Sequence, residues 1–458
     1  MNQVDHVFHR DFTKQYPIIT YGKGINLYDE AGKRYIDASS GAVAANLGHG
    51  VTEVAEAMAN QAKKAAFVHT LRFETQVLHD LSKKIALLAH QPLNKVYFTS
   101  GGSEANESAI KLARQFHRDS GRPEKQIVIG RWQSYHGNTM GSLSVGGDIK
   151  RRQVYTPNLL PMKHVYSPNC KRCPYQRNQT ECESAHNWSC IKDIERLIIE
   201  TGPDQISALI AEPITGSQLG AVSPPDRYFA EVRRLCDKYN ILMIIDEVMT
   251  GFGRTGMDFA IDHYNIIPDI ITFGKGVSAG FAPLGGMIVH DHIIEGLIRH
   301  SQGKFMHGYT YSGHPVSLAA GLSVLSIYER ERIVENVQKQ GAYLENQLRT
   351  LQKSYPIIFD VRGKGLLMGI ELAQPETGEP FPPEYQTAER MNALAMDLGI
   401  VFYPGSGSIN GQDGDHLLIC PPLTVNRAEI DEIIEKLETV LHIFMKNIDK
   451  GVANYDSI

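Results

Sequence analysis

A lysine between two glycines, Lys275, is the residue of this sequence whose setting most suggests chemistry. It lies in the stretch ITFGKGVSAGFAPLGG and follows an apolar run at 270–273. A lysine in a turn at the end of a strand can be exposed and inert, and taken alone this is the simpler interpretation. Partial burial would instead lower its pKa and free the amine to form a Schiff base with a carbonyl. Lys275 is therefore a candidate nucleophile.

A second candidate is the acidic pair Asp246-Glu247, which directly follows the apolar run ILMII at 241–245. Open α/β sheets bind ligands at the carboxyl ends of their strands. A carboxylate there can hold a protonated ring nitrogen or a metal. It can also simply cap the next loop, and the segment alone favours that alternative.

The glycine-rich segment SGGSEAN, residues 100–106, joins a predicted strand to a predicted helix. Glycines allow close backbone approach, and the helix start offers free N–H groups and a positive dipole end, so the segment suits an anion such as a phosphate. It matches neither a P-loop nor a GxGxxG fingerprint. The alternative is a tight turn with Ser103 as the N-cap of the helix.

The three segments together meet the needs of one cofactor, pyridoxal 5′-phosphate. Its phosphate needs backbone donors, its pyridine nitrogen needs a carboxylate, and its aldehyde needs an amine. The anion-binding turn, Asp246 and Lys275 occur in this order along the chain. We therefore expect them to meet on one α/β sheet.

The elements that must position these residues follow an alternating pattern from residue 95 to residue 289. Continuous apolar strands alternating with helices predict a mostly parallel sheet covered on both faces. The expected strands are 95–99, 126–130, 207–211, 241–245 and 270–272, and the expected helices follow SGGSEAN and span 227–240.

The pattern changes after Pro315, which predicts a second, smaller domain of α+β type. A helical stretch runs from Val316 to about Tyr355 with a break near Glu331. The remaining elements are expected at 361–372, at 388–398, near Val401 and Leu417, and in a final helix at 427–445.

Two domains are expected from these patterns. The large domain spans residues 61–330 and includes a cysteine-rich loop at 168–190, and the small domain combines residues 1–60 with residues 331–458. By pattern alone, the predicted hairpin at 24–39 fits either domain.

A set of motifs along nearly the whole chain carries a family resemblance: YDEAGKRYIDASSG, GHG, TSGGSEANESAIKLAR, SYHGNT, AEPI, IIDEVMTGFGRTG, TFGKG, PLGG, HGYTYSGHP, VRGKGLLMGIEL and CPPL. The chain resembles the class III (omega-type) aminotransferases of the aspartate-aminotransferase fold. The resemblance implies fold type I, with a mostly parallel seven-stranded sheet in the large domain and a smaller α+β domain.

The resemblance also implies roles for individual residues. Lys275 would form the Schiff base and shuttle the proton between the substrate's Cα and the cofactor, and Asp246 would pair with the pyridinium nitrogen. Thr310 of HGYTY would reach the cofactor of a neighbouring subunit, which implies a homodimer or a dimer of dimers. The other implied cofactor contacts are Val248 and Tyr135 on the two ring faces, Gly102 and Ser103 at the phosphate, His136, and Glu212 of AEPI. His136 could equally be structural, and Glu212 could only hold a loop.

The implied reaction is transfer of an amino group from an ω-amino acid, amine or amino acid to a 2-oxo acid, pyruvate or 2-oxoglutarate, with ping-pong kinetics. A pyridoxal-phosphate-dependent racemase or epimerase on the same fold is the alternative. A binding protein without activity is disfavoured because Lys275 and Asp246 are both present.

The substrate class stays open at this stage. Residues 403–422 contain no arginine or lysine, and Leu418 stands where many family members place a carboxylate-binding arginine, so the ornithine type of clamp is not expected. The biotin-pathway type is disfavoured by Gly41-Ala42. Arg72 could bind a carboxylate, although an ordinary surface position is the simpler interpretation.

The composition of the chain bears on its partners, its location and metal binding. The net charge is −5 and no basic patch is evident, so nucleic acid is not expected as a partner. No apolar run is long enough for a bilayer and the start of the chain has no export signal, so we expect no membrane contact and a cytoplasmic location. Cys170, Cys173, Cys182 and Cys190, with His186 nearby, could bind zinc, form disulfides or stay free. No metal is expected in the catalytic site.

Overall fold

The computed structural model describes residues 6–177, 179–184 and 188–449, and all statements below concern these residues. His186, one of the residues considered for a metal site, lies outside this range. Among the helices of the described residues, none combines the length and apolar character needed to cross a bilayer.

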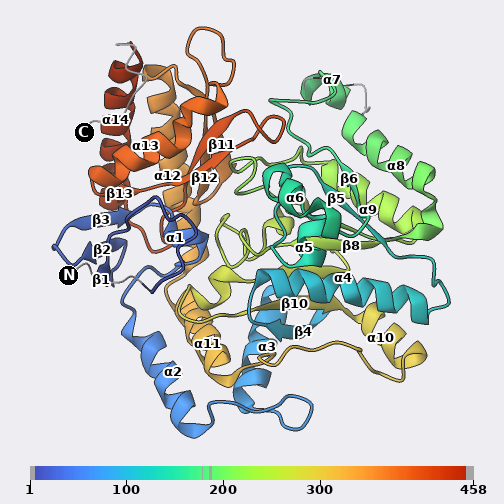
Figure 1. Ribbon diagram of the computed structural model, residues 1–458. Coiled ribbons are helices and arrows are strands. Elements are labelled where there is room, and N and C mark those ends of the chain that lie inside the picture. The colour runs from blue at the N-terminus through green and yellow to red at the C-terminus, as the bar shows by residue number, and fades with distance from the viewer. Residues whose placement is uncertain (1–5, 178, 185–187, 450–458) are drawn as a thin grey trace.

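A seven-stranded sheet forms the centre of the molecule, with the strand order β4-β10-β9-β8-β7-β5-β6 (Figure 1). Six strands run in one direction and only β10 runs against its neighbours β9 and β4. The predicted mostly parallel seven-stranded sheet is thus confirmed. The strands are β4 (Leu93–Thr99), β5 (Ile127–Arg131), β6 (Lys163–Val165), β7 (Ile206–Ala211), β8 (Leu242–Asp246), β9 (Ile270–Phe273) and β10 (Gly285–His290).

Helices cover both faces of this sheet, because successive side chains of a strand point to opposite sides. Ile244 packs with the helices of one face and Ile245 with those of the other. The first face holds α4 (Gly102–Asp119) and α10 (Asp291–His300). The second face holds α3 (Gln76–Leu88), α8 (Ser189–Thr201), α9 (Tyr228–Tyr239) and α11 (Pro315–Arg330).

Two smaller four-stranded sheets lie to one side, next to the C-terminal helices (Figure 1). In one of them the N-terminal hairpin pairs with a late strand: the order is β1-β2-β3-β13, and β13 runs parallel to β3. The other has the order β11-β12-β15-β14 and is antiparallel. Their strands are β1 (Ile19–Lys23), β2 (Asn26–Asp29), β3 (Arg34–Asp37), β11 (Ile358–Lys364), β12 (Leu367–Leu372), β13 (Ile400–Val401), β14 (Tyr403–Ser406) and β15 (Asp415–Ile419).

One apolar cluster joins these sheets to their helices, and it includes Ile36 of β3, Ile370 of β12 and Ile433 of the last helix. The pairing of β3 with β13 agrees with an N-terminal segment that belongs to the small domain, although the boundaries at residues 60 and 330 stay a prediction. The helices on this side are α12 (Ile333–Ser354), α13 (Thr387–Asp397) and α14 (Arg427–Asp449).

One local detail differs from the sequence expectations, and another confirms them. The helix after SGGSEAN begins at Gly102 with Gly101 as its N-cap, so Ser103 is not the capping residue. The expected break near Glu331 is a sharp one, because Arg332 adopts a left-handed conformation with φ of 52° between α11 and α12. The remaining helices are α1 (Ser40–Val43), α2 (Thr52–Lys64), α5 (Met140–Val145), α6 (Ile149–Tyr155) and α7 (Gln179–Ser184).

Candidate active site

A cavity of about 400 Å³ lies at the carboxyl edge of the central strands. The sheet brings the candidates together there, because β8 and β9 are parallel neighbours in which Asp246 pairs with Thr272. Lys275 follows β9 by two residues, so its amine and the carboxylate of Asp246 reach the same space. Eight of the nine residues proposed from the sequence line the cavity: Gly102, Ser103, Tyr135, His136, Glu212, Asp246, Val248 and Lys275.

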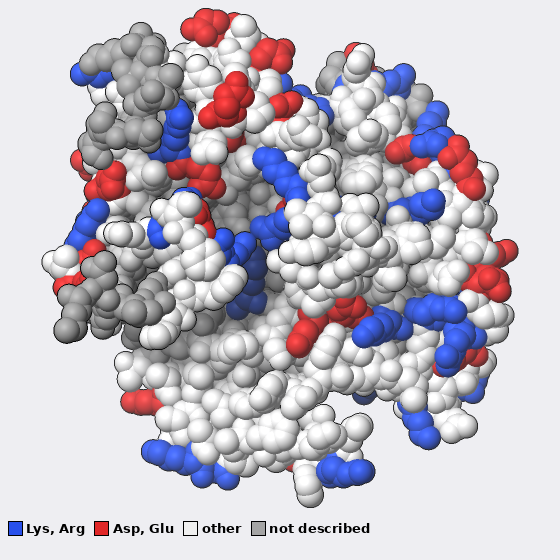
Figure 2. All heavy atoms as spheres, in the orientation of Figure 1, with Lys and Arg blue, Asp and Glu red and all other residues white. Residues whose placement is uncertain are grey.

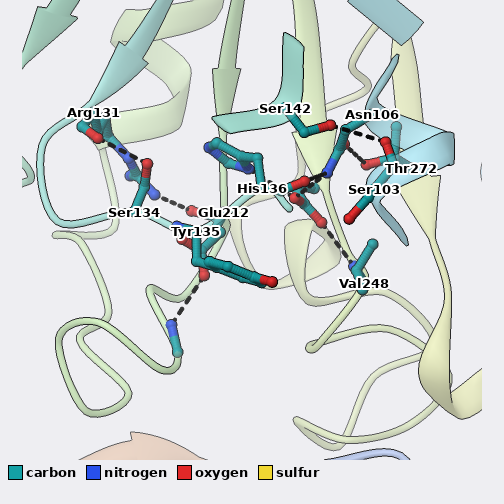
Figure 3. A network of polar contacts seen from close by, with 12 residues as sticks. Ser103, Asn106, Arg131, Ser134, Tyr135, His136, Ser142, Glu212, Val248 and Thr272 are labelled. Carbon is teal, nitrogen blue, oxygen red and sulfur yellow. Dashed lines mark hydrogen bonds and ion pairs between the residues drawn. The ribbon is translucent and has the colours of Figure 1, made fainter. Parts of the chain in front are cut away.

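Asp246 is buried and bonds to several polar groups, and Figure 3 labels three of its partners, Asn106, His136 and Val248. Its Oδ2 accepts a hydrogen bond of 2.8 Å from Nδ2 of Asn106 and lies 2.7 Å from Nδ1 of His136. Its Oδ1 accepts from the backbone N–H of Val248 at 3.0 Å. Three partners therefore fix the direction of this carboxylate.

Asn106 of α4 links Asp246 to the loop after β5 and to strand β9. Its Nδ2 also donates to the backbone oxygen of His136 at 2.7 Å, and its Oδ1 accepts from Oγ1 of Thr272 at 2.7 Å. Neither Asn106 nor Thr272 was expected to have a role from the sequence. The available signal was a polar residue one turn into α4, next to the segment already singled out.

The adjacent carboxylate, Glu247, has a different task. Its Oε1 accepts from the N–H of Ile261 at 2.8 Å and its Oε2 from the hydroxyl of Thr250. Complete burial raises the pKa of Glu247 to about 8. The loop-capping alternative considered for the pair thus describes Glu247, whereas Asp246 lines the cavity.

Lys275 is half-buried and starts a short 3-10 helix with a left-handed φ of 42°. Burial lowers the pKa of Lys275 to about 8, and the carboxylates of Asp246 and Glu212 oppose that effect only in part. The flanking glycine Gly276 has a packing reason, because a Cβ there would lie 2.3 Å from Nδ2 of Asn46. Lys275 therefore lines the cavity with a pKa lowered to about 8.

The first turn of α4 forms a cradle for an anion. The N–H groups at a helix start have no partners within the helix, and they carry the positive end of the dipole. A Cβ on Gly102 would lie 2.7 Å from Cγ1 of Val248, and a Cβ on Gly137 would lie 2.3 Å from Oγ of Ser103. Both glycines thus permit a backbone approach that a larger residue would block.

Glu212 ties two loops to the cavity wall. Its carboxylate accepts from the N–H of Tyr135 at 3.0 Å and from the N–H of Gly216 at 3.1 Å. Its backbone oxygen accepts from Nη2 of Arg131 at 2.6 Å. Burial raises the pKa of Glu212. Glu212 therefore holds loops in place and also faces the cavity.

Thr310, the ninth candidate, is exposed and does not line the cavity of its own chain. Its segment is anchored by His307, whose Nε2 lies 3.0 Å from Oγ of Ser108 in α4. The expected contact of Thr310 with a neighbouring subunit stays a prediction.

Two further residues discussed for substrate binding, Arg72 and Leu418, do not line the cavity. Arg72 is exposed, as the simpler interpretation expected, and Leu418 is buried in an apolar cluster.

The cysteines Cys170, Cys173, Cys182 and Cys190 are free thiols, so the disulfide alternative is not realised. Within the described ranges, no group of three or more histidine, cysteine, aspartate or glutamate residues is placed to hold a metal ion.

Comparison with known proteins identifies the class. The profile of the family described as "Aminotransferase class-III" matches residues 8–441, and the chain belongs to this family. It is an aminotransferase of fold type I that depends on pyridoxal 5′-phosphate, as its family does.

Three relatives illustrate the range of the similarity. A diaminobutyrate–2-oxoglutarate transaminase from Halomonas elongata is 37% identical, over 93% of this chain and 90% of its own length. A putrescine–pyruvate aminotransferase from Pseudomonas aeruginosa is 34% identical, over 91% of this chain and 88% of its own length. The omega transaminase from Pseudomonas jessenii, solved in complex with PMP, is 31% identical with a TM-score of 0.87. The match covers 94% of this chain and 93% of that chain.

Proposed function

We propose that this protein moves an amino group from an ω-amino acid, primary amine or amino acid to pyruvate or 2-oxoglutarate in two half-reactions. The observation that carries the proposal is the convergence of Lys275, Asp246 and the start of α4 on one cavity. An amine, a carboxylate and an anion cradle on three neighbouring elements fit the three polar groups of pyridoxal phosphate. When bound, this cofactor supplies an electron sink for charge that develops at the substrate's reacting carbon.

The chain's own groups would hold the cofactor in the following way. Lys275 would bind its aldehyde, Asp246 would pair with its ring nitrogen, and the N–H groups of Gly102 and Ser103 would bind its phosphate. Val248 and Tyr135 would contact the two ring faces, with Glu212 near the ring oxygen. His136 would act through Asp246, because its Nδ1 contacts that carboxylate.

Lys275 would have a second task once a substrate amine displaces it. A free amine with a pKa of about 8 can take up and return a proton near neutral pH. It would then move the proton to and from the substrate's reacting carbon. Lys275 lines the cavity beside Asp246 at the carboxyl edge of the sheet, which supports this assignment.

For the carboxylate of the 2-oxo acid, we propose Arg151 as a partner. Its guanidinium carbon lies 4.9 Å from the centre of the Tyr135 ring, which itself lines the cavity. Lysine and arginine side chains gather beside the central hollow in the region of α6 (Figure 2). Such a cation would take over the task of the arginine that residues 403–422 lack.

Two finer points belong to the proposal. Exposure of Thr310 is consistent with a homodimer in which it serves the neighbouring cofactor. Six free cysteines suit the reducing cytoplasm, where disulfides are rare.

The deciding experiment uses the visible absorbance of the holoenzyme. Addition of an amine donor alone should bleach the cofactor band, and pyruvate or 2-oxoglutarate should restore it with formation of the new amino acid. A panel of diamines, ω-amino acids and α-amino acids then identifies the donor. If amino acids change chirality without bleaching and without need of a 2-oxo acid, the racemase alternative replaces this proposal.

A further inference from the structure

A second cleft lies close to the cofactor cavity and has no part in the reaction proposed above. It encloses about 770 Å³, compared with about 400 Å³ for the cavity. Its walls come from residues 132–133, from α6 and Thr156, from residues 166–174 and from residues 408–410. The cleft and the cavity share no lining residue, so a ligand in one leaves the other open.

The charges that line the cleft have one sign. Arg152 and Arg172 line it, and none of its lining residues is acidic. Arg172 is compensated by Glu371, with 2.8 Å between Nε and Oε1. Arg152 instead donates from Nη1 to three neutral backbone oxygens, of Leu143, Ser144 and Gly146, at 2.7–2.8 Å. These hydrogen bonds to neutral groups do not neutralise the positive charge of the Arg152 guanidinium. The charge at the cleft therefore favours binding of an anion.

The cleft also offers an unused hydroxyl. Ser408 is 2% exposed, lines the cleft, and its Oγ has no hydrogen-bond partner among the described residues. Oγ itself is covered, so a ligand oxygen would reach it by shifting residues 408–410, and the new hydrogen bond would recover the free energy that a buried hydroxyl without a partner costs. The aromatic side chains of Trp132 and Tyr166 also line the cleft, with one face of the Trp132 ring stacked on His164.

A short loop connects the cleft to the cofactor cavity. Trp132 and Gln133 line the cleft, whereas Tyr135 and His136 line the cavity, and only Ser134 lies between them. Gln133 has a left-handed φ of 56°, an unusual conformation for a residue with a side chain. Its Nε2 donates to the backbone oxygen of Ser408 at 3.3 Å. A ligand that moved residues 408–410 would thus act on the loop that carries Tyr135.

We propose that this cleft is a second ligand site, which binds a small planar organic carboxylate through Arg152 and the hydroxyl of Ser408 and acts on the loop 132–136. The site is distinct from the one that binds cofactor and substrate.

The chain contains its own reporter for this site. Only two tryptophans occur, Trp132 in the cleft and the buried Trp188, so the variant Trp188→Phe leaves one emitter. Titration of its holoenzyme with benzoate should change the tryptophan fluorescence in a saturable way, whereas benzamide, of the same shape without charge, should not. If Trp188→Phe fails to fold, Trp132→Phe serves instead and should abolish the saturable change seen in the native protein.

An exposed residue of α6 provides matched charge variants. Gln153 lines the cleft and is exposed, so neither Gln153→Glu nor Gln153→Lys should disturb the core. Placing a charge next to the site should weaken benzoate binding about three- to tenfold in the first variant and strengthen it in the second. Equal affinities in the two variants, or no saturation by benzoate, would overturn the proposal. Competitive displacement by 2-oxoglutarate would also overturn it, since benzoate would then occupy the catalytic cavity.

Discussion

The carboxylate of Asp246 and the imidazole of His136 form a buried pair, with 2.7 Å between Oδ2 and Nδ1. Asp246 is the last residue of β8, and His136 lies in the loop that follows β5. Asn106 bonds to both of them and so keeps the pair together. A carboxylate held in this way presents a fixed charge to the cavity, and the first prediction tests that charge.

Asp246→Asn keeps the shape of the side chain and removes its charge. Loss of the partner for the cofactor's ring nitrogen should lower kcat by about 100-fold or more. Such a loss corresponds to an increase of about 3 kcal/mol in the activation free energy. The matched control is Glu247→Gln. Because burial raises the pKa of Glu247 to about 8, its carboxyl is already mostly protonated at pH 7, and the amide should leave kcat nearly unchanged. Steady-state kinetics at pH 7 compare the two, and similar losses would contradict the division of roles.

Lys275→Ala should abolish turnover, because no amine would remain to hold the cofactor aldehyde or to move the proton. Reduction of the native holoenzyme with borohydride should fix the cofactor on Lys275, as read by peptide mass, and the variant should show no such product. The exposed Lys339→Ala is the control and should keep full activity. Labelling at another lysine of the native protein would disprove the assignment.

The pH dependence of cofactor uptake follows from the lowered pKa of Lys275. Only the neutral amine attacks an aldehyde, and with a pKa of about 8 roughly one amine in ten is neutral at pH 7. The rate at which apoenzyme captures pyridoxal phosphate should therefore rise about tenfold per pH unit below pH 8 and level off above it. Stopped-flow absorbance measures this rate. A rise that continues to pH 10 would indicate an ordinary lysine.

Thr310 can be tested by subunit mixing. If it serves the neighbouring cofactor, a dimer of one Lys275→Ala chain and one Thr310→Ala chain contains one site with both residues intact. Mixed dimers should then regain up to about half of the native activity per dimer, whereas each variant alone stays low. If Thr310 acts within its own chain, mixing restores nothing. Differently tagged chains allow the mixed dimers to be purified and assayed.

Arg151→Gln tests the partner proposed for the acceptor. The KM for pyruvate or 2-oxoglutarate should rise about tenfold, in keeping with the loss of one charge-assisted hydrogen bond. Bleaching of the cofactor band by a diamine, which carries no carboxylate, should keep its native rate. Lys150→Gln is the control on the same helix, because Lys150 bonds instead to Oγ of Ser406 at 2.9 Å. An unchanged KM would assign the carboxylate to another residue.

Much of the central sheet was predictable because its strands are continuous apolar runs. The run at 241–245 and the run at 270–272 appear as β8 and β9, within one residue of expectation. The edge strand β6 escaped, since three residues are too few for a periodic signal. The strand β10 was also not among the expected strands, and its reversed direction depends on connections rather than on composition.

The presence of Lys275 and Asp246 in one cavity was predictable, because an amine and a carboxylate at strand ends are typical reactive groups. Asn106 and Thr272 escaped because an amide in a helix and a threonine in a strand are common surface and core residues. Only their contact across the sheet, 2.7 Å between Oδ1 and Oγ1, gives them a task. The role expected for Thr310 concerns a neighbouring subunit, so it stays a prediction.

The parallel pairing of β8 with β9 has a practical consequence for redesign. The reacting groups hang from a rigid frame whose spacing is dictated by backbone hydrogen bonds, while Arg151 belongs to a short, separate helix. If Arg151 binds the acceptor's carboxylate as proposed, alterations around that helix should change which molecules are accepted while the reactive atoms keep their mutual distance. Such an arrangement lends itself to directed evolution toward new amines.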